Sequence, residues 1–480
     1  PDPADSEVLT ALLCLLFEAR DQGHLCLPLS GLATAWAVHP GAEQLALDWN
    51  FGGMGLSRKL LATGLAYRAS DRMAAPAQDC AALIFDGDGP DASVYFQGMH
   101  RAESRLLQLL ARHGNQAALP APESLHAGLD AWFRQLPARH QPEKLQAAAV
   151  HQALDHRLFI LGGGPGTGKT TTVFHLLHGL FLAGTAKLAL AAPTGRAAAR
   201  LQESLARSLT ELREWLGSDH DRAFADWLGA ARGMTLHRLL GQSSVFSEFD
   251  SDLTPLPFDL IVVDEASMVD LDQMLLLLTR LPATARLILV GDQNQLPSVG
   301  AGSILADLAG GERFIARVQL EHCFRSDTAI LDCAKAVLAG RLPDLGGSTQ
   351  GTIQSLSLGA RHQANQVRHQ LISRWAGEQD ITSLAAACRF GDRPAADPAT
   401  AARLYAEASR SVLLSPLREG PWGVQALNAQ VAALLGPATE WPAGMMAMVT
   451  RNDYQRGLFN GDRGLVCRWG GRPMVWFPDP

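Results

Sequence analysis

Short apolar runs recur through the middle of the chain, and each one ends in a polar loop. They occupy positions 157–161, 187–192, 259–263 and 286–290. Continuous apolar runs of about four to eight residues are typical of strands buried on both faces of a parallel sheet. Apolar residues with helical spacing follow the first run, at 171–177. The pattern predicts an α/β domain in which strands and helices alternate around a parallel sheet.

The flanking regions have weaker patterns. Residues 104–110 show helical spacing in an Ala- and Leu-rich stretch, and the segment 120–122, Pro-Ala-Pro, indicates a domain boundary. After about residue 341 the chain is rich in Gly, Pro and Ser, and an Arg- and His-rich helix at 361–374 is typical of a solvated face. From about 445 alternating apolar positions predict a small β-rich segment.

Composition narrows the class of protein. With 480 residues, 47% of them hydrophobic and 19% charged, the chain is long enough for about three globular domains. The absence of an apolar run of about 18 residues predicts no membrane segment. The 7 cysteines lie far apart without zinc-ligand spacing, which is typical of a reducing, cytoplasmic environment. A net charge of -7 argues against coating DNA by bulk electrostatics, so any nucleic-acid contact should lie in a local groove.

A glycine-rich loop joins the first predicted strand to the first predicted helix. Successive backbone N–H groups in such a loop form a cradle for anions, and glycine permits the dihedral angles that this needs. Lys169 would reach the β- and γ-phosphates of a nucleotide, and the Thr170 hydroxyl would bind Mg²⁺. The alternative is a glycine-rich turn that matches the motif by chance. The predicted strand before the loop and the predicted helix after it argue against that alternative. The expected nucleotide-binding residues of the loop are Gly163, Gly164, Pro165, Gly166, Thr167, Gly168, Lys169, Thr170 and Thr171.

Two acids follow the run at 259–263. Acids at the carboxyl end of a buried parallel strand face the crevice in which open α/β sheets bind ligands. Asp264 would hold Mg²⁺, and Glu265 would act as the general base that orients and deprotonates the attacking water. A solvated acidic strand end is the alternative. With the glycine-rich loop, this pair predicts a P-loop nucleotide hydrolase.

The loops after the other two strands resemble those of superfamily 1 helicases. Pro193-Thr194-Gly195-Arg196 follows one strand, and Gly291-Asp292-Gln293-Asn294-Gln295-Leu296-Pro297 follows the other. The resemblance implies that Gln295 senses the γ-phosphate and that Thr194 and Arg196 contact the backbone of single-stranded DNA.

Three further segments resemble the same family in the same order. Gln146 precedes the loop as the adenine-reading glutamine does, although it could be a plain helix-surface residue. Thr235 and His237 belong to a Thr-Leu-His-Arg-Leu-Leu segment that lies along DNA in the family; a histidine of the core is the alternative for His237. Arg325 resembles an arginine finger, for which a planar, always ionised guanidinium is suited. A surface salt bridge is the alternative for Arg325.

The details of the motifs are similar to those of the RecD branch, which translocates 5′-to-3′. The segments that carry the likeness are 163–172, 263–270, 418–428 and 457–464. The resemblance implies an ATP- and Mg²⁺-dependent DNA helicase subunit acting on the 5′-ended single strand with RecB-like and RecC-like partners. It also implies a cytoplasmic, nucleoid-associated location and no nuclease site. A stand-alone RecD-like helicase and an ATP-binding structural subunit without motor activity are the alternatives.

The resemblance implies three domains. We expect an α-helical N-terminal docking domain at 1–118 and a RecA-like P-loop motor domain at 119–341. A short hairpin near 245–257 would be either a strand-separating pin or a plain surface hairpin. We expect an incomplete second RecA-like domain at 342–480, with a small β-rich, SH3-like insertion from about 445. The family's late DNA-binding motif and its final arginine-finger motif are not found in these 480 residues.

Overall fold

The computed structural model divides into two compact units, Pro1–Ser326 and Asp327–Pro480, and each is described by itself. The structure describes residues 3–43, 66–69, 82–87, 92–114, 121–215, 218–241, 254–296, 298, 300–310, 315–324, 328–341, 353, 361–390, 398–435, 441–451, 453 and 455–478.

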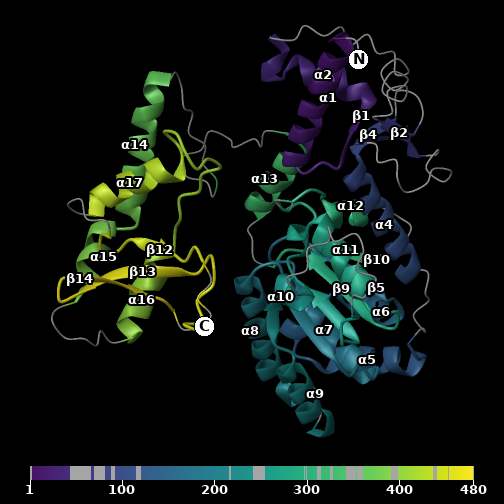
Figure 1. The fold of residues 1–480 in the computed structure, drawn as a ribbon. Helices are drawn as coiled ribbons and strands as arrows, with labels where there is room; N and C mark the ends of the chain where they lie inside the picture. Colours follow the sequence, from purple (N-terminus) through teal and green to yellow (C-terminus); the bar gives the residue numbers. More distant parts are fainter. Residues whose placement is uncertain are drawn as a thin grey trace. The chain divides into compact units, whose positions relative to one another are not determined.

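A six-stranded sheet forms the centre of the first unit (Figure 1). Its strands are β5 (Leu158–Gly163), β6 (Leu188–Ala192), β7 (Gly233–Thr235), β8 (Leu260–Val263), β9 (Arg286–Gly291) and β10 (Ala316–Leu320). They are ordered β10-β5-β9-β8-β6-β7, and every neighbouring pair is parallel. The four predicted strands are confirmed within two residues of their expected starts and ends. The edge strands β7 and β10 were not predicted.

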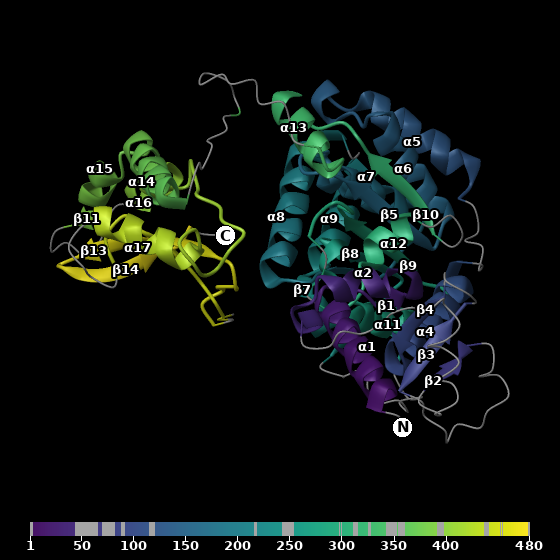
Figure 2. The same cartoon turned by 90° about the horizontal axis from the view of Figure 1, so that it is seen from above.

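Helices cover both faces of this sheet, because successive strand residues point to opposite sides. Phe159 and Leu161 pack towards α5 (Glu123–Gln135), α6 (Lys144–Asp155), α7 (Lys169–Leu182), α8 (Gly195–Leu212) and α9 (Ser218–Ala230). Leu158 and Ile160 pack towards α4 (Gln97–Gly114), α10 (Leu236–Leu240), α11 (Leu271–Arg280) and α12 (Ile304–Gly310). Figure 2 shows α5 and α6 on one side of the strands and α4 and α11 on the other. The six-stranded sheet and these helices form a three-layer α/β/α domain, as the apolar runs predicted.

The N-terminal region of this unit contains a second sheet. Its strands β1 (Cys26–Pro28), β2 (Ala66–Arg68), β3 (Leu83–Asp86) and β4 (Ser93–Phe96) are ordered β1-β4-β3-β2. Helices α1 (Pro3–Asp21) and α2 (Leu32–Ala37) pack Leu12 and Trp36 against Val94. The helical pattern at 104–110 is confirmed in α4, whereas the sheet was not predicted. Helix α4 contributes to the core beneath β5, and the buried His113 Nε2 lies 3.1 Å from the Leu278 carbonyl oxygen of α11.

The expected hairpin falls largely outside the described residues, which omit 242–253. Its end is held by Arg280, whose carbonyl oxygen accepts a hydrogen bond from the Leu256 N–H at 2.8 Å. The Arg280 Nε donates to the Thr254 carbonyl oxygen at 3.0 Å. The choice between a strand-separating pin and a plain hairpin therefore stays open.

The second unit combines helices with a small sheet. Its elements are α13 (Thr328–Leu338), α14 (Arg361–Glu378), α15 (Ile381–Ala387), β11 (Arg389–Phe390), α16 (Pro398–Ala408), α17 (Val424–Leu435), β12 (Met446–Met448), β13 (Arg463–Trp469) and β14 (Arg472–Trp476). Strand β13 pairs antiparallel with β12 and β14 and parallel with β11. Leu384 and Leu404 pack against Leu465 in the core of this unit. The β-rich segment from about 445 is confirmed, and the second RecA-like domain stays a prediction.

The short 3-10 helices are Leu29–Gly31, Pro40–Glu43, Ala138–His140, Arg213–Trp215 and Ala266–Met268. Among the helices of the described ranges, none is long and apolar enough to span a membrane.

Candidate active site

The parallel strands of the six-stranded sheet all end at one edge, and the loops that leave this edge surround a cavity. Its volume is about 610 Å³. Strand β5 leads into the glycine-rich loop, β8 into Asp264 and Glu265, and β9 into the loop of Gln295. The cavity is lined by Gly164, Pro165, Gly166, Thr167, Gly168, Lys169, Thr170, Thr171, Thr194, Arg196, Ala197, Arg200, Leu201, Ser204, Asp264, Glu265, Met268 and Gln295. Loops distant in sequence thus meet at one site.

The glycine-rich loop has the backbone that an anion cradle requires. Gly166 and Gly168 have φ angles of 76° and 81°, which L-residues other than glycine rarely adopt. Gly168 is the N-cap of α7 and has no side-chain cap, so the first N–H groups of the helix are not used by a capping side chain. A Cβ at Gly163 would lie 2.5 Å from the Thr167 Oγ1, which explains the glycine there. The loop and the positive end of α7 together suit a phosphate chain.

Lys169 lies where its ammonium group can reach this cradle. Its Nζ donates hydrogen bonds to the carbonyl oxygens of Gly163 at 2.6 Å and Gly164 at 3.0 Å. Thr167 Oγ1 donates to the Gly164 carbonyl oxygen at 2.9 Å, which tightens the same turn. These bonds hold the only cation of the glycine-rich loop beside its N–H groups.

The two acids after β8 differ in environment. The pKa of Asp264 is raised to about 6, chiefly by burial and also by the charge of Glu265, whereas the Glu265 N–H and Lys169 oppose the shift. The Asp264 Oδ1 accepts a hydrogen bond from the Glu265 N–H at 2.9 Å. Glu265 itself has a left-handed backbone with φ 51° and ψ 40°. Such a conformation costs a non-glycine residue about 1 to 2 kcal/mol, and strain of this kind is concentrated at functional sites.

The oxygen donors here fit a magnesium ion. Asp264 provides a carboxylate and Thr170 a hydroxyl, the hard ligands that Mg²⁺ prefers. Within the described ranges, no three His, Cys, Asp or Glu side chains are arranged to hold a metal ion by themselves. A site with Asp264 as its carboxylate ligand and Thr170 as its hydroxyl ligand fits Mg²⁺ bound together with substrate phosphates, rather than an all-protein metal cage.

Gln295 is held at the cavity by a residue that the sequence analysis did not single out. Asp292 is only 3% exposed, and its Oδ1 accepts a hydrogen bond from the Asn294 N–H at 3.0 Å. The Asp292 carbonyl oxygen accepts from the Gln295 N–H at 3.1 Å. Asp292 therefore shapes the loop that presents Gln295. An acid directly after a buried strand was the signal that could have identified it.

Gln146 lies behind the glycine-rich loop and does not line the cavity. Its Oε1 accepts a hydrogen bond from the Glu143 N–H at 2.9 Å, which completes a capping box at the start of α6. Its Nε2 donates to the Thr167 carbonyl oxygen at 3.3 Å. The side chain thus joins α6 to the loop, and its expected contact with adenine stays a prediction.

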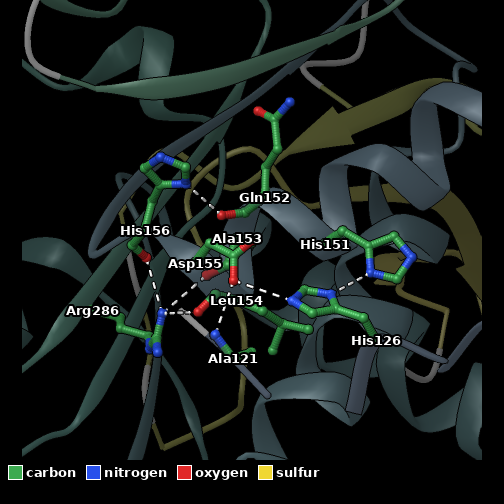
Figure 3. A network of polar contacts seen from close by, with 9 residues as sticks. All are labelled: Ala121, His126, His151, Gln152, Ala153, Leu154, Asp155, His156 and Arg286. Atoms are coloured by element: carbon green, nitrogen blue, oxygen red, sulfur yellow. Dashed lines mark hydrogen bonds and ion pairs between the residues drawn. The ribbon is translucent and has the colours of Figure 1, made fainter. Parts of the chain in front are cut away.

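The opposite end of α6 is anchored by a network that Figure 3 shows. His126 of α5 lies between His151 and Asp155: its Nδ1 is 2.7 Å from the His151 Nδ1, and its Nε2 is 3.2 Å from the Asp155 Oδ1. Arg286 of β9 donates through Nη1 to the carbonyl oxygen of Leu154 at 2.6 Å. These contacts fix the helix that carries Gln146 to both a neighbouring helix and the sheet.

The residues expected to contact DNA lie at the ends of β6 and β7. Thr194 and Arg196 line the cavity, whereas Thr235 and His237 do not. Ala192 of β6 is opposite Thr235 in the register of the two strands, so both pairs are at the same edge of the sheet. The exposed His237 has its Nε2 3.2 Å from the Nε2 of Gln273 in α11, so it is not a core histidine.

Arg325 lies outside the described residues, but the segment before it reaches the glycine-rich loop. The Phe324 N–H donates to the Gly166 carbonyl oxygen at 2.9 Å, and the Cys323 Sγ lies 3.2 Å from the Pro165 carbonyl oxygen. The role of Arg325 as an arginine finger stays a prediction.

The chain is similar in sequence to several known proteins. Residues 146–301 match a family model described as an AAA domain. The RecBCD enzyme subunit RecD of Mycolicibacterium smegmatis is 38% identical over 344 residues, which cover 67% of this chain and 56% of that protein. The protein of the same name from Mycobacterium tuberculosis is 36% identical over 338 residues, covering 67% and 55%. The ATP-dependent RecD2 DNA helicase of Deinococcus radiodurans is 29% identical over 483 residues, covering 97% and 55%.

The three-layer domain, the glycine-rich loop and the paired acids define a P-loop nucleotide-binding domain. Within that class the chain is RecD-like, as its motifs predicted. The chain spans about half the length of the curated relatives that it matches.

Proposed function

We propose that this chain is the ATP-dependent 5′-to-3′ DNA helicase subunit of a RecBCD-like complex that processes double-strand breaks for recombinational repair. The observation that carries the proposal is that Lys169, Asp264, Glu265 and Gln295 line one cavity at the carboxyl edge of a parallel sheet. The relatives named as RecBCD subunits support the assignment to such a complex. RecB-like and RecC-like chains are therefore the proposed partners, and the cytoplasmic nucleoid the proposed location.

The proposed chemistry assigns one task to each side chain. The N–H groups of the glycine-rich loop and Lys169 bind the β- and γ-phosphates, while Thr170 and Asp264 hold Mg²⁺. Bound Mg²⁺ neutralises charge on the β- and γ-phosphate oxygens. Glu265 orients the attacking water and takes its proton, and Gln295 senses the γ-phosphate. Arg325 stabilises the charge of the transition state.

The proposed DNA path uses the ends of the two neighbouring strands. Thr194, Arg196, Thr235 and His237 contact the backbone of the 5′-ended single strand, and the coupling to ATP runs through the loop of Gln295. Contacts to phosphates alone give binding with little preference for base sequence. The N-terminal helices and their sheet would dock on the RecC-like partner.

An ATPase assay stimulated by single-stranded DNA, on the gene product with and without its partners, tests the proposal. Lys169→Ala should lower turnover by about 100- to 1000-fold, because preorganised contacts to transition-state charge have this magnitude. Lys187→Ala is the matched control, since Lys187 is exposed and does not line the cavity. Glu265→Gln should keep nucleotide binding and lose hydrolysis. Nucleotide binding without DNA-stimulated turnover in the wild type would instead indicate a structural subunit.

A further inference from the structure

One face of α8 forms a wall of the nucleotide cavity. Ala197, Arg200, Leu201 and Ser204 line the cavity, and their spacing of three and four residues places them along one stripe of the helix. Helix α8 packs beside α7, the helix that follows the glycine-rich loop, because Leu201 and Leu205 share a core with α7. The stripe therefore extends the cavity from the glycine-rich loop along α8, and the proposed function gives it no task.

The side-chain charges that line the cavity, counted without the Mg²⁺ that Thr170 and Asp264 would hold, are nearly balanced. Its lining includes the carboxylates of Asp264 and Glu265, which repel phosphate oxygens, and three basic side chains: Lys169, Arg196 and Arg200. Lys169 alone would leave an excess of negative charge among these groups, against a ligand that is itself negative. Arg196 offsets this excess, and only with Arg200 does the lining carry a net positive charge.

Arg200 is available for such a ligand. Its side chain is exposed, and it makes no hydrogen bond or ion pair with the rest of the described chain. A guanidinium group can donate two parallel hydrogen bonds to a phosphate, an arrangement that an ammonium group cannot match. Arg207, seven residues further along α8, is also exposed but does not line the cavity.

We propose that Arg200 binds the terminal phosphate of the nucleoside triphosphate and so makes the site prefer a triphosphate over a diphosphate. The inference rests on the proposed function, because it requires that the cavity hold a nucleotide. Lys169 reaches the β- and γ-phosphates from the glycine-rich loop, and Arg200 lines the same cavity from α8, outside that loop. A contact between Arg200 and the terminal phosphate is lost when the nucleotide is a diphosphate, so Arg200 adds to the preference for the triphosphate.

Nucleotide binding by the full chain tests this role. Affinities for the non-hydrolysable analogue adenylyl imidodiphosphate and for ADP, both with Mg²⁺, are measured for the wild type, Arg200→Gln and the control Arg207→Gln. We expect Arg200→Gln to weaken binding of the analogue by about 10- to 100-fold, the range for one charge-assisted hydrogen-bonded contact, and ADP binding by less than about twofold. Arg207→Gln should change neither affinity, and Arg200→Lys should recover part of the loss. Equal thermal melting temperatures exclude misfolding.

Three outcomes would overturn the assignment of Arg200. The first is an equal loss of affinity for both nucleotides in Arg200→Gln, and the second is no change in either affinity. The third is a loss of affinity for single-stranded DNA with both nucleotide affinities unchanged, which would place Arg200 on the DNA. Failure of the proposed function has a different result, because the wild type would then bind neither nucleotide and Lys169→Ala would have no effect.

Discussion

Thr194 and Thr235 stand at the carboxyl ends of neighbouring parallel strands, and each caps the helix that follows. Thr194 Oγ1 accepts a hydrogen bond from the Ala197 N–H and Thr235 Oγ1 from the Arg238 N–H, both at 3.2 Å. A hydroxyl that accepts in a cap still has its own O–H to donate. The same side chain can therefore hold a helix start and donate to a DNA phosphate.

These two roles of Thr235 can be separated by substitution. Asp is as good a helix cap as Thr, but its carboxylate has no donor and repels phosphate. Thr235→Asp should leave stability and nucleotide affinity unchanged and weaken single-stranded DNA binding. Thr235→Val should lose the cap, at a cost of about 1 kcal/mol in stability, and also weaken DNA binding. Fluorescence anisotropy with labelled DNA and chemical denaturation measure the two effects, and unaltered DNA affinity in Thr235→Asp would remove Thr235 from the DNA path.

Arg196 should contact the DNA backbone without reading bases. Arg196→Ala should weaken binding of single strands of every sequence alike. It should also flatten the slope of log affinity against log salt by about 0.7, the value for one phosphate on a single strand. Titrations with homopolymers at several salt concentrations measure both effects. A loss confined to certain base sequences would indicate base reading, and an unchanged slope would place Arg196 on the nucleotide alone.

Asp264 should make magnesium use sensitive to mild acid. Its pKa is raised from 3.8 to about 6, so it takes up a proton as the pH falls through 6 and then cannot hold Mg²⁺. The Mg²⁺ concentration needed for half-maximal turnover should rise as the pH is lowered from 7.5 to 5.5. A folded carboxyl with a raised pKa binds its proton more tightly than the unfolded chain does, so its contribution to stability falls as pH rises from 3.8 through 6.

Asp264→Asn checks the same shift by a second route. Without Mg²⁺ at pH 8 it should be more stable than the wild type, by up to about 3 kcal/mol, because it removes a buried charge. The gain should shrink to about 0.5 kcal/mol at pH 4, where Asp264 is protonated in the folded state and partly protonated in the unfolded chain, whose pKa is 3.8. Chemical denaturation at the two pH values measures it. A variant that is less stable at pH 8 would mean that Asp264 is fully stabilised as an anion by its neighbours.

The central strands and the nucleotide loop could be predicted because each is a local pattern. Strands β5 and β8 are fully buried, so their apolar runs are unbroken. Strand β7 is short and half-buried along its length, and its residues carry no such pattern. The strands of the N-terminal sheet have only three or four residues each, too few to establish a period.

The tertiary contacts of the site were not readable from local patterns. Gln146 matched a motif, yet its amide is used by the capping box and by the Thr167 carbonyl oxygen, which depends on where α6 ends relative to the loop. Arg200 joins the site only because α8 packs beside α7. Asp292 shows its part only once its hydrogen bonds to the backbone of the Gln295 loop are known.

The last prediction concerns His175, which lies in the core of α7 two turns after Lys169. Its ring centroid is 5.5 Å from those of both Trp132 and Phe133, it is fully buried, and neither ring nitrogen has a hydrogen-bond partner in the described chain. The pKa of His175 is lowered to about 3, chiefly by burial and also by the neighbouring His178 and His140. The unfolded chain takes up this proton near pH 6.5, but the folded chain does not until about pH 3. The free energy of unfolding should therefore fall as pH drops below 6.5, by about 1.4 kcal/mol per pH unit from this group, and this group should not affect it above pH 6.5.

Urea unfolding at pH 7.5 and 5.0 should show a loss about 2 kcal/mol larger in the wild type than in His175→Leu, whose side chain cannot be protonated. The exposed His156 provides the control, since His156→Leu should keep the wild-type pH dependence. Equal losses in the wild type and His175→Leu would mean that the folded protein already accommodates a charged His175, and that the aromatic packing around it is looser than the structure has it.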